Sequence, residues 1–208
     1  MTLQEFPLFG DFYLSPVQHS DSQKITWAMN NEDITRTLAG PPFIPYEEKH
    51  AHEFIDSMEA RKWNDEVPLV WVVRDRSKDG LFIGTISIRP SDITPERANF
   101  RDHIPKAREN VPHKFATFGF YMDPAYQGKG LMSKSLEVMV HKIGHDIFGI
   151  KAFYGCSFIG NWASRRTFEK AGFTYAEDQL GAGIKLVTDE PRDLWVYELY
   201  LDDSKGEY

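Results

Sequence analysis

Apolar positions change their spacing along the chain, and each spacing predicts a type of secondary structure. Apolar residues recur every three or four positions in residues 47–63 and 131–147, which is typical of helices with one buried face. Shorter helices are predicted over residues 21–31 and 161–171, the second ending at Gly172. Apolar runs that suit strands lie in residues 6–18, 68–74, 81–89, 115–122, 151–158, 173–178 and 192–201. The pattern therefore predicts an α/β (α+β) fold of about seven strands and four helices.

Proline, glycine and charged residues mark the segments between these elements. Three prolines in residues 39–46 exclude regular structure there, and residues 78–80 predict a turn between two strands. Residues 181–183 and 189–191 are predicted as loop. Residues 90–113 are long for a hairpin connection, and we expect them to form a lid beside the substrate or a dimer contact. No repeat or linker divides the chain, so residues 1–208 are predicted to form a single domain.

A strand, a turn and the start of a helix meet between residues 115 and 132. Asp123-Pro124 ends the strand, and the helix begins after Gly128 and Gly130. The first turn of a helix has main-chain N–H groups without partners, and its dipole favours anions. Glycine has no Cβ, so a phosphate can approach this main chain closely. The stretch is therefore predicted to bind a phosphate group.

Other phosphate-binding and catalytic motifs do not match. The chain has no Walker sequence G-x-x-x-x-G-K-[ST], and Ser133 stands where a dinucleotide fingerprint needs its third glycine. His141 and His145 lack the glutamate of a zinc-protease helix, since Lys142 occupies that position. The sequence around Cys156 is not the G-x-S-x-G turn of serine hydrolases, so Cys156 is predicted to be a buried strand residue. No metal site is predicted.

Two stretches resemble motifs of one enzyme superfamily. Gln127-Gly128-Lys129-Gly130 resembles the Q/R-x-x-G-x-G/A pyrophosphate loop of GNAT-superfamily acyltransferases, with Met132 where that pattern has a small residue. The run from Asn161 to Phe173 resembles the N-x-x-S…E-K-x-G-F helix of the same superfamily. Three further segments resemble the branch that contains ribosomal-protein N-terminal acetyltransferases: residues 12–16, 43–46 and 83–88. The resemblance covers nearly the whole chain.

This resemblance implies the GNAT acyl-CoA N-acyltransferase fold, a mixed, mostly antiparallel sheet with flanking helices and splayed central strands. It implies acetyl-CoA as co-substrate, with the pantetheine lying between the splayed strands like an added strand. The cofactor-binding residues that it implies are Phe120, Tyr121, Met122, Gln127, Gly128, Lys129, Gly130, Leu131, Met132 and Asn161. Ser164 matches a serine that hydrogen-bonds and protonates the coenzyme A sulfur in relatives. Phe43 and Tyr46 lie in the loop that shapes the acceptor pocket of relatives.

Several of these residues also have plain structural explanations. Asn161 and Ser164 suit the N-terminal cap and first turn of a helix. Arg165 and Lys170 either approach the phosphates or are solvated helix charges. Trp71 either lines the acceptor site or packs in the core. All of these alternatives stay open in the sequence.

The position of the general base departs from the superfamily pattern. Relatives often carry a glutamate two positions before the strand glycine, here Gly119, and Thr117 stands in its place. Threonine cannot act as a base at neutral pH. At pH 7 roughly 10% of an α-amine is neutral, against less than about 0.1% of a lysine amine. We therefore expect a weakly basic amine as acceptor; candidate proton relays are Glu177, Asp178, Tyr197 and Glu198.

Composition narrows the partners and the compartment. A formal net charge of −7 argues against nucleic acid as main partner and suits a cationic amine. No apolar run is long enough to span a membrane, and no secretory signal is recognisable. One cysteine fits a reducing compartment, so a cytoplasmic location is predicted.

Together these features predict an acetyl-CoA-dependent N-acetyltransferase, monomeric or homodimeric. It would acetylate a protein N-terminal α-amine or a small-molecule amine by direct attack in a ternary complex, since no covalent nucleophile is recognisable. The alternative is a non-catalytic GNAT-fold module that binds acyl-CoA or regulates a partner. A nucleotide-binding oxidoreductase is a third possibility.

Overall fold

The structure is a computed structural model that describes residues 5–64, 66–92, 103–108 and 114–202. Within them, eight strands form one sheet in the order β1-β2-β3-β4-β5-β6-β8-β7. The strands are β1 (Phe6–Pro7), β2 (Phe12–Pro16), β3 (Val70–Asp75), β4 (Leu81–Asp92), β5 (Lys114–Met122), β6 (Ala152–Phe158), β7 (Thr174–Lys185) and β8 (Glu190–Tyr200). Neighbouring strands are antiparallel, except that β5 and β6 run parallel.

Helices complete the fold around this sheet. The α-helices are α1 (Ser22–Asn30), α2 (Glu32–Thr35), α3 (Glu48–Glu59), α4 (Leu131–Val138) and α5 (Trp162–Lys170). A π-helix, η5 (Met139–His145), continues α4, and short 3-10 helices are η1 (His19–Asp21), η2 (Arg76–Lys78), η3 (Lys106–Arg108) and η4 (Pro124–Tyr126). The mixed, mostly antiparallel sheet with flanking helices confirms the predicted fold class.

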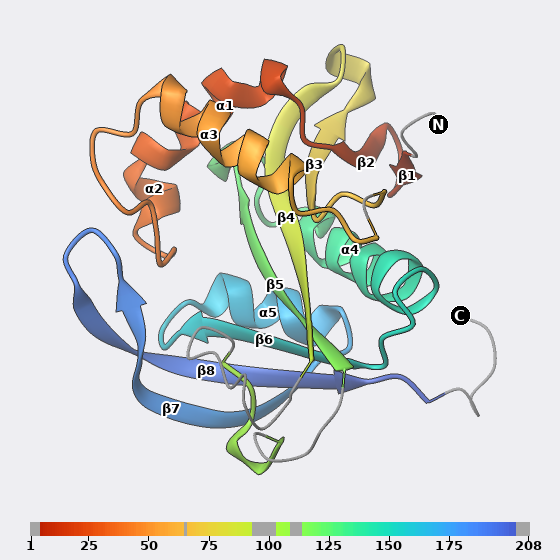
Figure 1. Cartoon of the computed structure of the whole chain (residues 1–208), viewed down its shortest axis with the longest axis vertical. Coiled ribbons are helices and arrows are strands. Elements are labelled where there is room, and N and C mark those ends of the chain that lie inside the picture. Colours follow the sequence, from red (N-terminus) through yellow and green to blue (C-terminus); the bar gives the residue numbers. More distant parts are fainter. Residues whose placement is uncertain (1–4, 65, 93–102, 109–113, 203–208) are drawn as a thin grey trace.

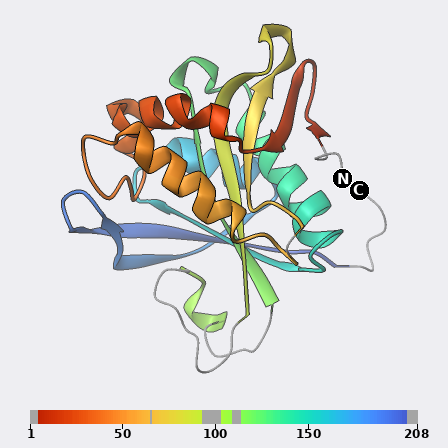
Figure 2. The same ribbon diagram turned by 45° about the horizontal axis from the view of Figure 1, so that its top comes forward.

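The helices cover opposite faces of the sheet (Figure 1). Successive side chains of a strand point to opposite faces, so each face has its own core. On one face, Ile25 of α1 and Ile55 of α3 pack in a cluster with Val72. On the other, Leu136 of α4 and Phe168 of α5 belong to the larger cluster; Figure 2 shows the two helix layers from a second direction.

The β7–β8 hairpin is longer than the sequence pattern predicts. Residues 181–183 lie within β7, and β8 already begins at Glu190, so the predicted loops were wrong there. A register shift between Gln179 and Gly183 accommodates the glycines in an irregular part of the ladder. Pro191 pairs with Ile184 at a point where β6 no longer adjoins β8, which is where a strand tolerates proline.

The irregular segment predicted over residues 90–113 begins later than expected. β4 continues through Pro90 to Asp92, beyond the end of its pairing with β3, so Pro90 has a neighbouring strand on one side only. Within the described residues 103–108, Ile104 packs against Phe115 and its carbonyl accepts a hydrogen bond from Gln179 Nε2 (2.7 Å). Residues 93–102 and 109–113 lie outside the described residues, so the lid or dimer contact remains a prediction.

Smaller differences concern element ends. The opening strand is divided into β1 and β2, and α2 was not predicted. Asn31 caps α2 by accepting a hydrogen bond from the Asp33 amide (2.9 Å), a local signal that the apolar pattern does not contain. Gly172 follows α5 with a φ of 91°, as expected for a helix-ending glycine.

Candidate active site

β5 and β6 pair for only part of their length. Their parallel ladder has three residue pairs, the last of which joins Thr117 with Tyr154. Beyond this point β5 stays with β4 as far as Met122, while β6 stays with β8 as far as Phe158. Figure 1 shows β4 and β5 running across the direction of β6 and β8. The central strands therefore splay apart, and the diverging part of β5 presents a strand edge on which an extended ligand can lie.

Three residues predicted to contact the cofactor lie on this diverging part of β5. Phe120 and Met122 pack with the α4–α5 face, where the Phe120 ring lies 5.3 Å from that of Phe168. Tyr121 packs with the opposite face, against the α1–α3 cluster. Because these side chains are used in packing above and below the sheet, contacts to a ligand lying along the edge of β5 would come from their main chain.

Both strands lead into helices at the diverging end. Since β5 and β6 are parallel, their carboxyl ends lie at the same edge of the sheet. The glycine loop, defined as residues 127–133, follows β5 and leads into α4, and Asn161 follows β6 and caps α5. The N-termini of α4 and α5 are therefore carried to the same end of the splay, where their dipoles favour a negatively charged ligand.

Local contacts fix the glycine loop to the end of β5. The Asp123 carboxylate accepts a hydrogen bond from the Ala125 amide (2.9 Å) and starts η4. Gln127 Nε2 donates to the Met122 carbonyl (3.2 Å) and so joins the loop to the strand. Gly130 then caps α4 in the left-handed conformation, with a φ of 79°. The loop is thus held in place by its own residues before any ligand binds.

The amides of the glycine loop are available to a ligand. Lys134 is the first residue of α4 whose amide has a helical partner, the Gly130 carbonyl (3.0 Å). Among the residues that the structure describes, the six amides of residues 128–133 make no main-chain hydrogen bond of good geometry, although residues 127 and 128 form a turn. A Cβ added to Gly128 or Gly130 would meet nothing within 4 Å, so the space beside the loop is open. This arrangement suits a phosphate group.

The side chains that begin α4 turn away from this space. Leu131 and Met132 are buried in the main core, with 1% and 7% of their surfaces exposed. Met132, which replaces the small residue of the superfamily pattern, therefore does not fill the glycine loop. Its larger side chain is accommodated by the core beneath α4.

Two lysines bring positive charge to the loop, and one of them was not predicted. Lys129 Nζ lies 4.8 Å from the centroid of the Tyr126 ring. Lys78, from the β3–β4 turn, donates to the Tyr126 hydroxyl (2.7 Å), and this bond raises the pKa of Lys78. Lys78 is 48 residues away from Tyr126 in the chain, so only the strand pairing brings it to the loop.

Asn161 and Ser164 lie at the start of α5. Asn161 Oδ1 accepts a hydrogen bond from the Ser164 amide (3.2 Å), so its capping role is confirmed. Ser164 is partly exposed, and its hydroxyl has no hydrogen-bond partner among the described residues. Gly155 allows α5 to approach β6, because a Cβ there would lie 2.1 Å from the Phe168 ring. A contact between Ser164 or Asn161 and a cofactor stays a prediction.

Arg165 belongs to a separate cluster. Its Nε pairs with Glu169 (2.8 Å), and its guanidinium lies over the Trp162, Trp195 and Tyr175 rings. Lys170 lies in the last turn of α5, at the end opposite Ser164. The Arg165 side chain is therefore held by Glu169 and the aromatic rings rather than by the glycine loop.

The predicted acceptor residues form an aromatic group held by α1. Asn30 donates through Nδ2 to the Tyr46 carbonyl (2.7 Å) and accepts from the Tyr46 amide (3.0 Å). Phe43 stacks on Tyr46 with ring centroids 5.8 Å apart, and it also contacts His50 of α3. Phe43 is exposed, whereas Tyr46 is buried and donates to the His50 carbonyl (3.1 Å). Phe43 therefore offers an accessible aromatic surface on the α1–α3 side.

Trp71 and Cys156 have mainly structural positions. Trp71 is only 2% exposed and donates from Nε1 to the Pro68 carbonyl (2.9 Å), so it packs in the core rather than lining the acceptor site. Cys156 lies on β6 as predicted, but it is partly exposed rather than buried.

The candidate proton relays differ in their surroundings. Glu177 accepts hydrogen bonds from the Lys106 amide (3.1 Å) and Gln179 Nε2 (2.9 Å), and Asp178 accepts from the Tyr175 hydroxyl (2.9 Å). These carboxylates therefore hold neighbouring segments. Tyr197 is fully buried beside Ser157, with the two hydroxyls 3.2 Å apart, and burial raises its pKa.

Thr117 and Tyr121, two polar residues of β5, do not provide a base. Thr117 is buried at the last pair of the β5–β6 ladder. The Tyr121 hydroxyl is buried and makes no hydrogen bond of good geometry with the described residues, although Thr85 lies opposite it in β4. Burial raises the pKa of Tyr121 strongly, so the group remains a neutral phenol.

The β7–β8 hairpin reaches the segment that follows α2. Lys185 Nζ donates to the carbonyls of Thr35 and Leu38, the latter at 2.7 Å. The Leu186 amide donates to the Ala39 carbonyl (2.8 Å). Burial, with a smaller contribution from Arg192, lowers the pKa of Lys185. These contacts hold the start of the loop that carries Phe43 and Tyr46.

Comparison with protein families decides the assignment. A model of the acetyltransferase (GNAT) domain matches residues 11–174, which include the splayed strands, the glycine loop and α5. The chain belongs to the GNAT acetyltransferase family. The predicted family and the predicted enzyme class, an N-acetyltransferase, are therefore confirmed. A search of curated protein sequences finds no match.

Solved structures of GNAT enzymes share the whole fold. RimL, a ribosomal L7/L12 α-N-protein acetyltransferase in complex with coenzyme A, has 16% identity and a TM-score of 0.71, covering 96% of this chain and 99% of that one. Ribosomal-protein-S5-alanine acetyltransferase from Vibrio fischeri has 18% identity and a TM-score of 0.67, covering 98% and 100%. Spermidine N-acetyltransferase from Vibrio cholerae, with coenzyme A and spermine, has 16% identity and a TM-score of 0.64, covering 91% and 95%.

No helix in the described part of the GNAT chain is long and apolar enough to cross a membrane.

Proposed function

We propose that this GNAT-family protein transfers the acetyl group of acetyl-CoA to a primary amine, and that an α-amine at a protein or peptide N-terminus is its preferred acceptor class. The observation that carries the proposal is the run of available amides at residues 128–133, directly after the diverging part of β5. A loop of this kind suits a diphosphate, and an open strand edge beside it suits an extended amide chain. Acetyl-CoA contains both groups.

The glycine loop would hold the diphosphate of acetyl-CoA. Its amides donate hydrogen bonds to phosphate oxygens, and Lys129 and Lys78 contribute positive charge beside Tyr126. Hydrogen bonds to charged groups are stronger than neutral ones, so this end of the site would supply much of the affinity. Binding energy at the diphosphate then positions the distant thioester along β5.

The reaction would proceed by direct attack. The neutral amine nitrogen bonds to the thioester carbon, the carbon–sulfur bond breaks, and the amine loses a proton to water or a relay. A main-chain N–H on the diverging part of β5 would stabilise the negative charge that develops on the thioester oxygen. Ser164 would give its hydroxyl proton, or a hydrogen bond, to the departing thiolate, and would regain a proton from solvent.

The proposed acceptor class is based on the residue at position 117, where relatives often have a glutamate and this chain has a threonine. Thr117 stands at the last β5–β6 pair, where it cannot remove a proton from an ammonium group. An acceptor that is already partly neutral at pH 7 needs no such base, and an α-amine with a pKa of about 8 meets this condition. Two of the three relatives described above act on ribosomal proteins, which also supports a protein N-terminus.

A release assay on three acceptors tests the proposal. The acceptors are a peptide with a free N-terminus, a peptide with an acetylated N-terminus and one lysine, and spermidine. Free coenzyme A is measured with a thiol reagent in the Cys156→Ser variant, because the natural chain carries one cysteine thiol of its own. We expect release with the free N-terminus to exceed release with the lysine peptide by at least about tenfold at pH 7.

Other outcomes of the assay have distinct meanings. Faster release with spermidine would contradict the preference for an α-amine and leave the acetyltransferase proposal intact. No release with any acceptor, together with tight acetyl-CoA binding, would favour the non-catalytic module, which the absence of a carboxylate at Thr117 also favours.

A further inference from the structure

A cluster of metal-ligating side chains lies on the surface where η1 meets α3. His19, Asp56 and Glu59 each offer one possible ligand atom, and these atoms all lie within 4.8 Å of one another. His19 Nε2 and Asp56 Oδ1 are 3.1 Å apart, and all three side chains are exposed. Two ligands of one zinc ion are separated by about 3.3 Å when metal–ligand bonds are about 2.0–2.1 Å long and the geometry is tetrahedral. Small side-chain rotations would therefore complete a three-ligand site.

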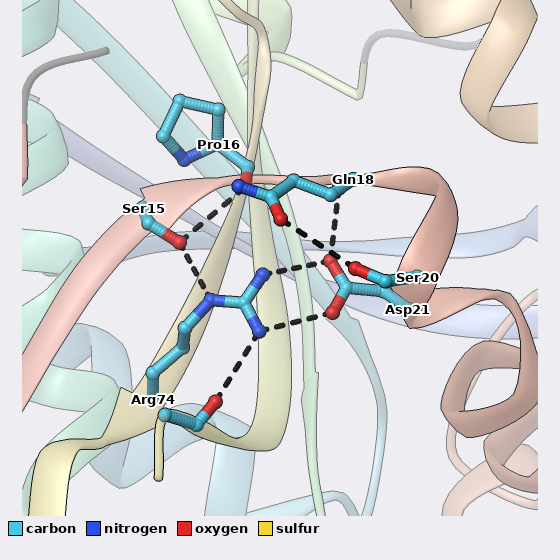
Figure 3. A network of polar contacts seen from close by, with 7 residues as sticks. Ser15, Pro16, Gln18, Ser20, Asp21 and Arg74 are labelled. Carbon is cyan, nitrogen blue, oxygen red and sulfur yellow. Dashed lines mark hydrogen bonds and ion pairs between the residues drawn. The ribbon is translucent and has the colours of Figure 1, made fainter. Parts of the chain in front are cut away.

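Regular structure brings these residues together. Asp56 and Glu59 are three residues apart on α3, so they lie on one face of the helix. His19 is two residues before Asp21, which is fixed to the sheet by Arg74, as Figure 3 shows. The ligands thus come from two segments that are separately anchored.

The second nitrogen of the His19 ring already has a partner. His19 Nδ1 lies 3.0 Å from Nδ1 of His52, and the two rings stack with centroids 5.2 Å apart. If His19 Nε2 holds a metal, its Nδ1 carries the proton and donates it to His52. Histidine ligands in metal sites are usually oriented by such a bond on the other ring nitrogen.

His52 is itself positioned from α1 and α3. Its Nε2 lies 3.9 Å from Glu48 Oε1, and the same carboxylate oxygen accepts a hydrogen bond from the Ser22 hydroxyl (2.7 Å). The polar chain from Ser22 through Glu48 and His52 to His19 therefore orders the ring that would bind the metal. A simple His19–Asp56 ion pair requires none of these additional groups.

We propose that His19, Asp56 and Glu59 form a binding site for a divalent transition-metal ion of the zinc class, with water in the remaining position. An imidazole in the ligand set favours zinc, cobalt or nickel over magnesium and calcium, which prefer oxygen ligands alone. The bound ion would join η1, the segment before α1, to helix α3. Helix α1 carries Asn30 and helix α3 carries His50, and these two residues contact the predicted acceptor residues Tyr46 and Phe43.

Metal titrations test this site directly. The tag-free full chain carrying Cys156→Ser, which removes the only thiol, is titrated with ZnCl₂ or MgCl₂ by calorimetry, and CoCl₂ binding is followed by visible absorption. We expect one zinc ion per chain, no detectable magnesium binding, and a raised Tm in the presence of zinc. His19→Ala is expected to abolish binding, and Asp56→Asn and Glu59→Gln each to weaken it at least about tenfold.

The chain offers a matched control in a second exposed histidine–aspartate pair. His145 Nδ1 and Asp146 Oδ1 are 3.0 Å apart, but they do not belong to a three-ligand cluster among the described residues. His145→Ala should leave the zinc stoichiometry and affinity unchanged. Equal zinc binding by the Cys156→Ser chain and by the same chain with His19→Ala, loss of binding in His145→Ala, or no binding at 100-fold molar excess of zinc would overturn the proposal. These side chains are exposed, so circular dichroism should find each variant folded.

Discussion

At the scale of single residues, the Ser164 hydroxyl is the group that we propose acts on the departing thiolate. Its amide is bonded to Asn161, while its hydroxyl has no partner among the described residues. We predict that Ser164→Ala lowers kcat by about tenfold and leaves the KM for acetyl-CoA within about twofold, because the hydroxyl acts on the departing sulfur rather than on binding. Steady-state kinetics at saturating amine measures both constants.

Thr167 provides the control on the same helix. Its hydroxyl donates to the Ala163 carbonyl (3.0 Å), so Thr167→Ala removes a hydroxyl that is already bonded within α5. Both kinetic constants should match those of the natural enzyme. An unchanged kcat in Ser164→Ala would exclude the proposed role in protonating the thiolate.

Gly155 shows how one residue sets the position of α5. The Phe168 ring lies so close that a Cβ on Gly155 would be 2.1 Å from it. Gly155→Ala is predicted to lower the free energy of unfolding by about 1–3 kcal/mol through overpacking. Urea denaturation gives this value, and Gly155→Ala combined with Phe168→Leu should recover part of it. A fully stable Gly155→Ala protein would contradict the packing described for β6 and α5.

At the scale of elements, a buried ion pair fixes the start of α1 to the sheet. Figure 3 shows the Arg74 guanidinium between Ser15 and Asp21, with bonds of 3.0 and 2.8 Å to the two Asp21 oxygens and 2.6 Å to the Ser15 hydroxyl. The main-chain N–H of Gln18 completes the arrangement by donating a hydrogen bond to Asp21 Oδ2 (2.9 Å). The network joins η1 to β2 and β3.

Removing one partner of this pair should be costly. Asp21→Asn leaves the Arg74 charge buried without its counter-ion, and we predict a loss of about 3–5 kcal/mol in the free energy of unfolding. Chemical denaturation of Asp21→Asn, Arg74→Met and the double variant gives the coupling energy. If the double variant loses the full sum of the single losses, the two residues act independently and the prediction is wrong.

The sequence pattern predicted which elements exist better than where they end. The amphipathic helices and apolar strands were recognisable because burial of one face imposes a period on the residues. The extents of β4 and β8 were not, because Pro90 and Pro191 indicate a break unless the neighbouring strand is known to have ended. The glycines of β7 were misleading for a similar reason, since they lie in a register shift rather than in a loop.

The candidate site was predicted unevenly for a related reason. Its loop and α5 are contiguous motifs, so the residues 127–132, Asn161 and Ser164 were recognisable in the chain. Lys78 and Lys185 reach the site only through the pairing of distant strands, and nothing in their immediate sequence distinguishes them from other surface lysines. Only the structure shows where these two lysines lie.

At the scale of the whole molecule, Lys185 of β7 contacts the segment that leads to the predicted acceptor residues Phe43 and Tyr46. Replacing it with methionine keeps a long, unbranched side chain that is one atom shorter, and removes the donors to Thr35 and Leu38. We predict that Lys185→Met raises the KM for the amine several-fold and leaves acetyl-CoA affinity unchanged, because the loop bearing Phe43 loses a support. Amine and acetyl-CoA saturation curves measure the two effects separately.

Lys142→Met serves as the control for that variant. Lys142 is exposed on η5 and pairs with Asp146 (3.2 Å). The helix η5 continues α4, on the face of the sheet opposite to α1 and α3. Its loss should change neither constant. A Lys185→Met enzyme with a natural KM for the amine would show that the hairpin contact does not shape the acceptor site.

The central claim is that the amides of the glycine loop hold the diphosphate of acetyl-CoA, and calorimetric titration of coenzyme A into Gly130→Val tests it most directly. Gly149→Val is the matched control, because Gly149 also has a positive φ (68°) and open space around its Cβ position. We predict at least about tenfold weaker binding for Gly130→Val, equivalent to about 1.4 kcal/mol, and unchanged binding for Gly149→Val. Equal affinity in Gly130→Val and the natural protein would contradict the account.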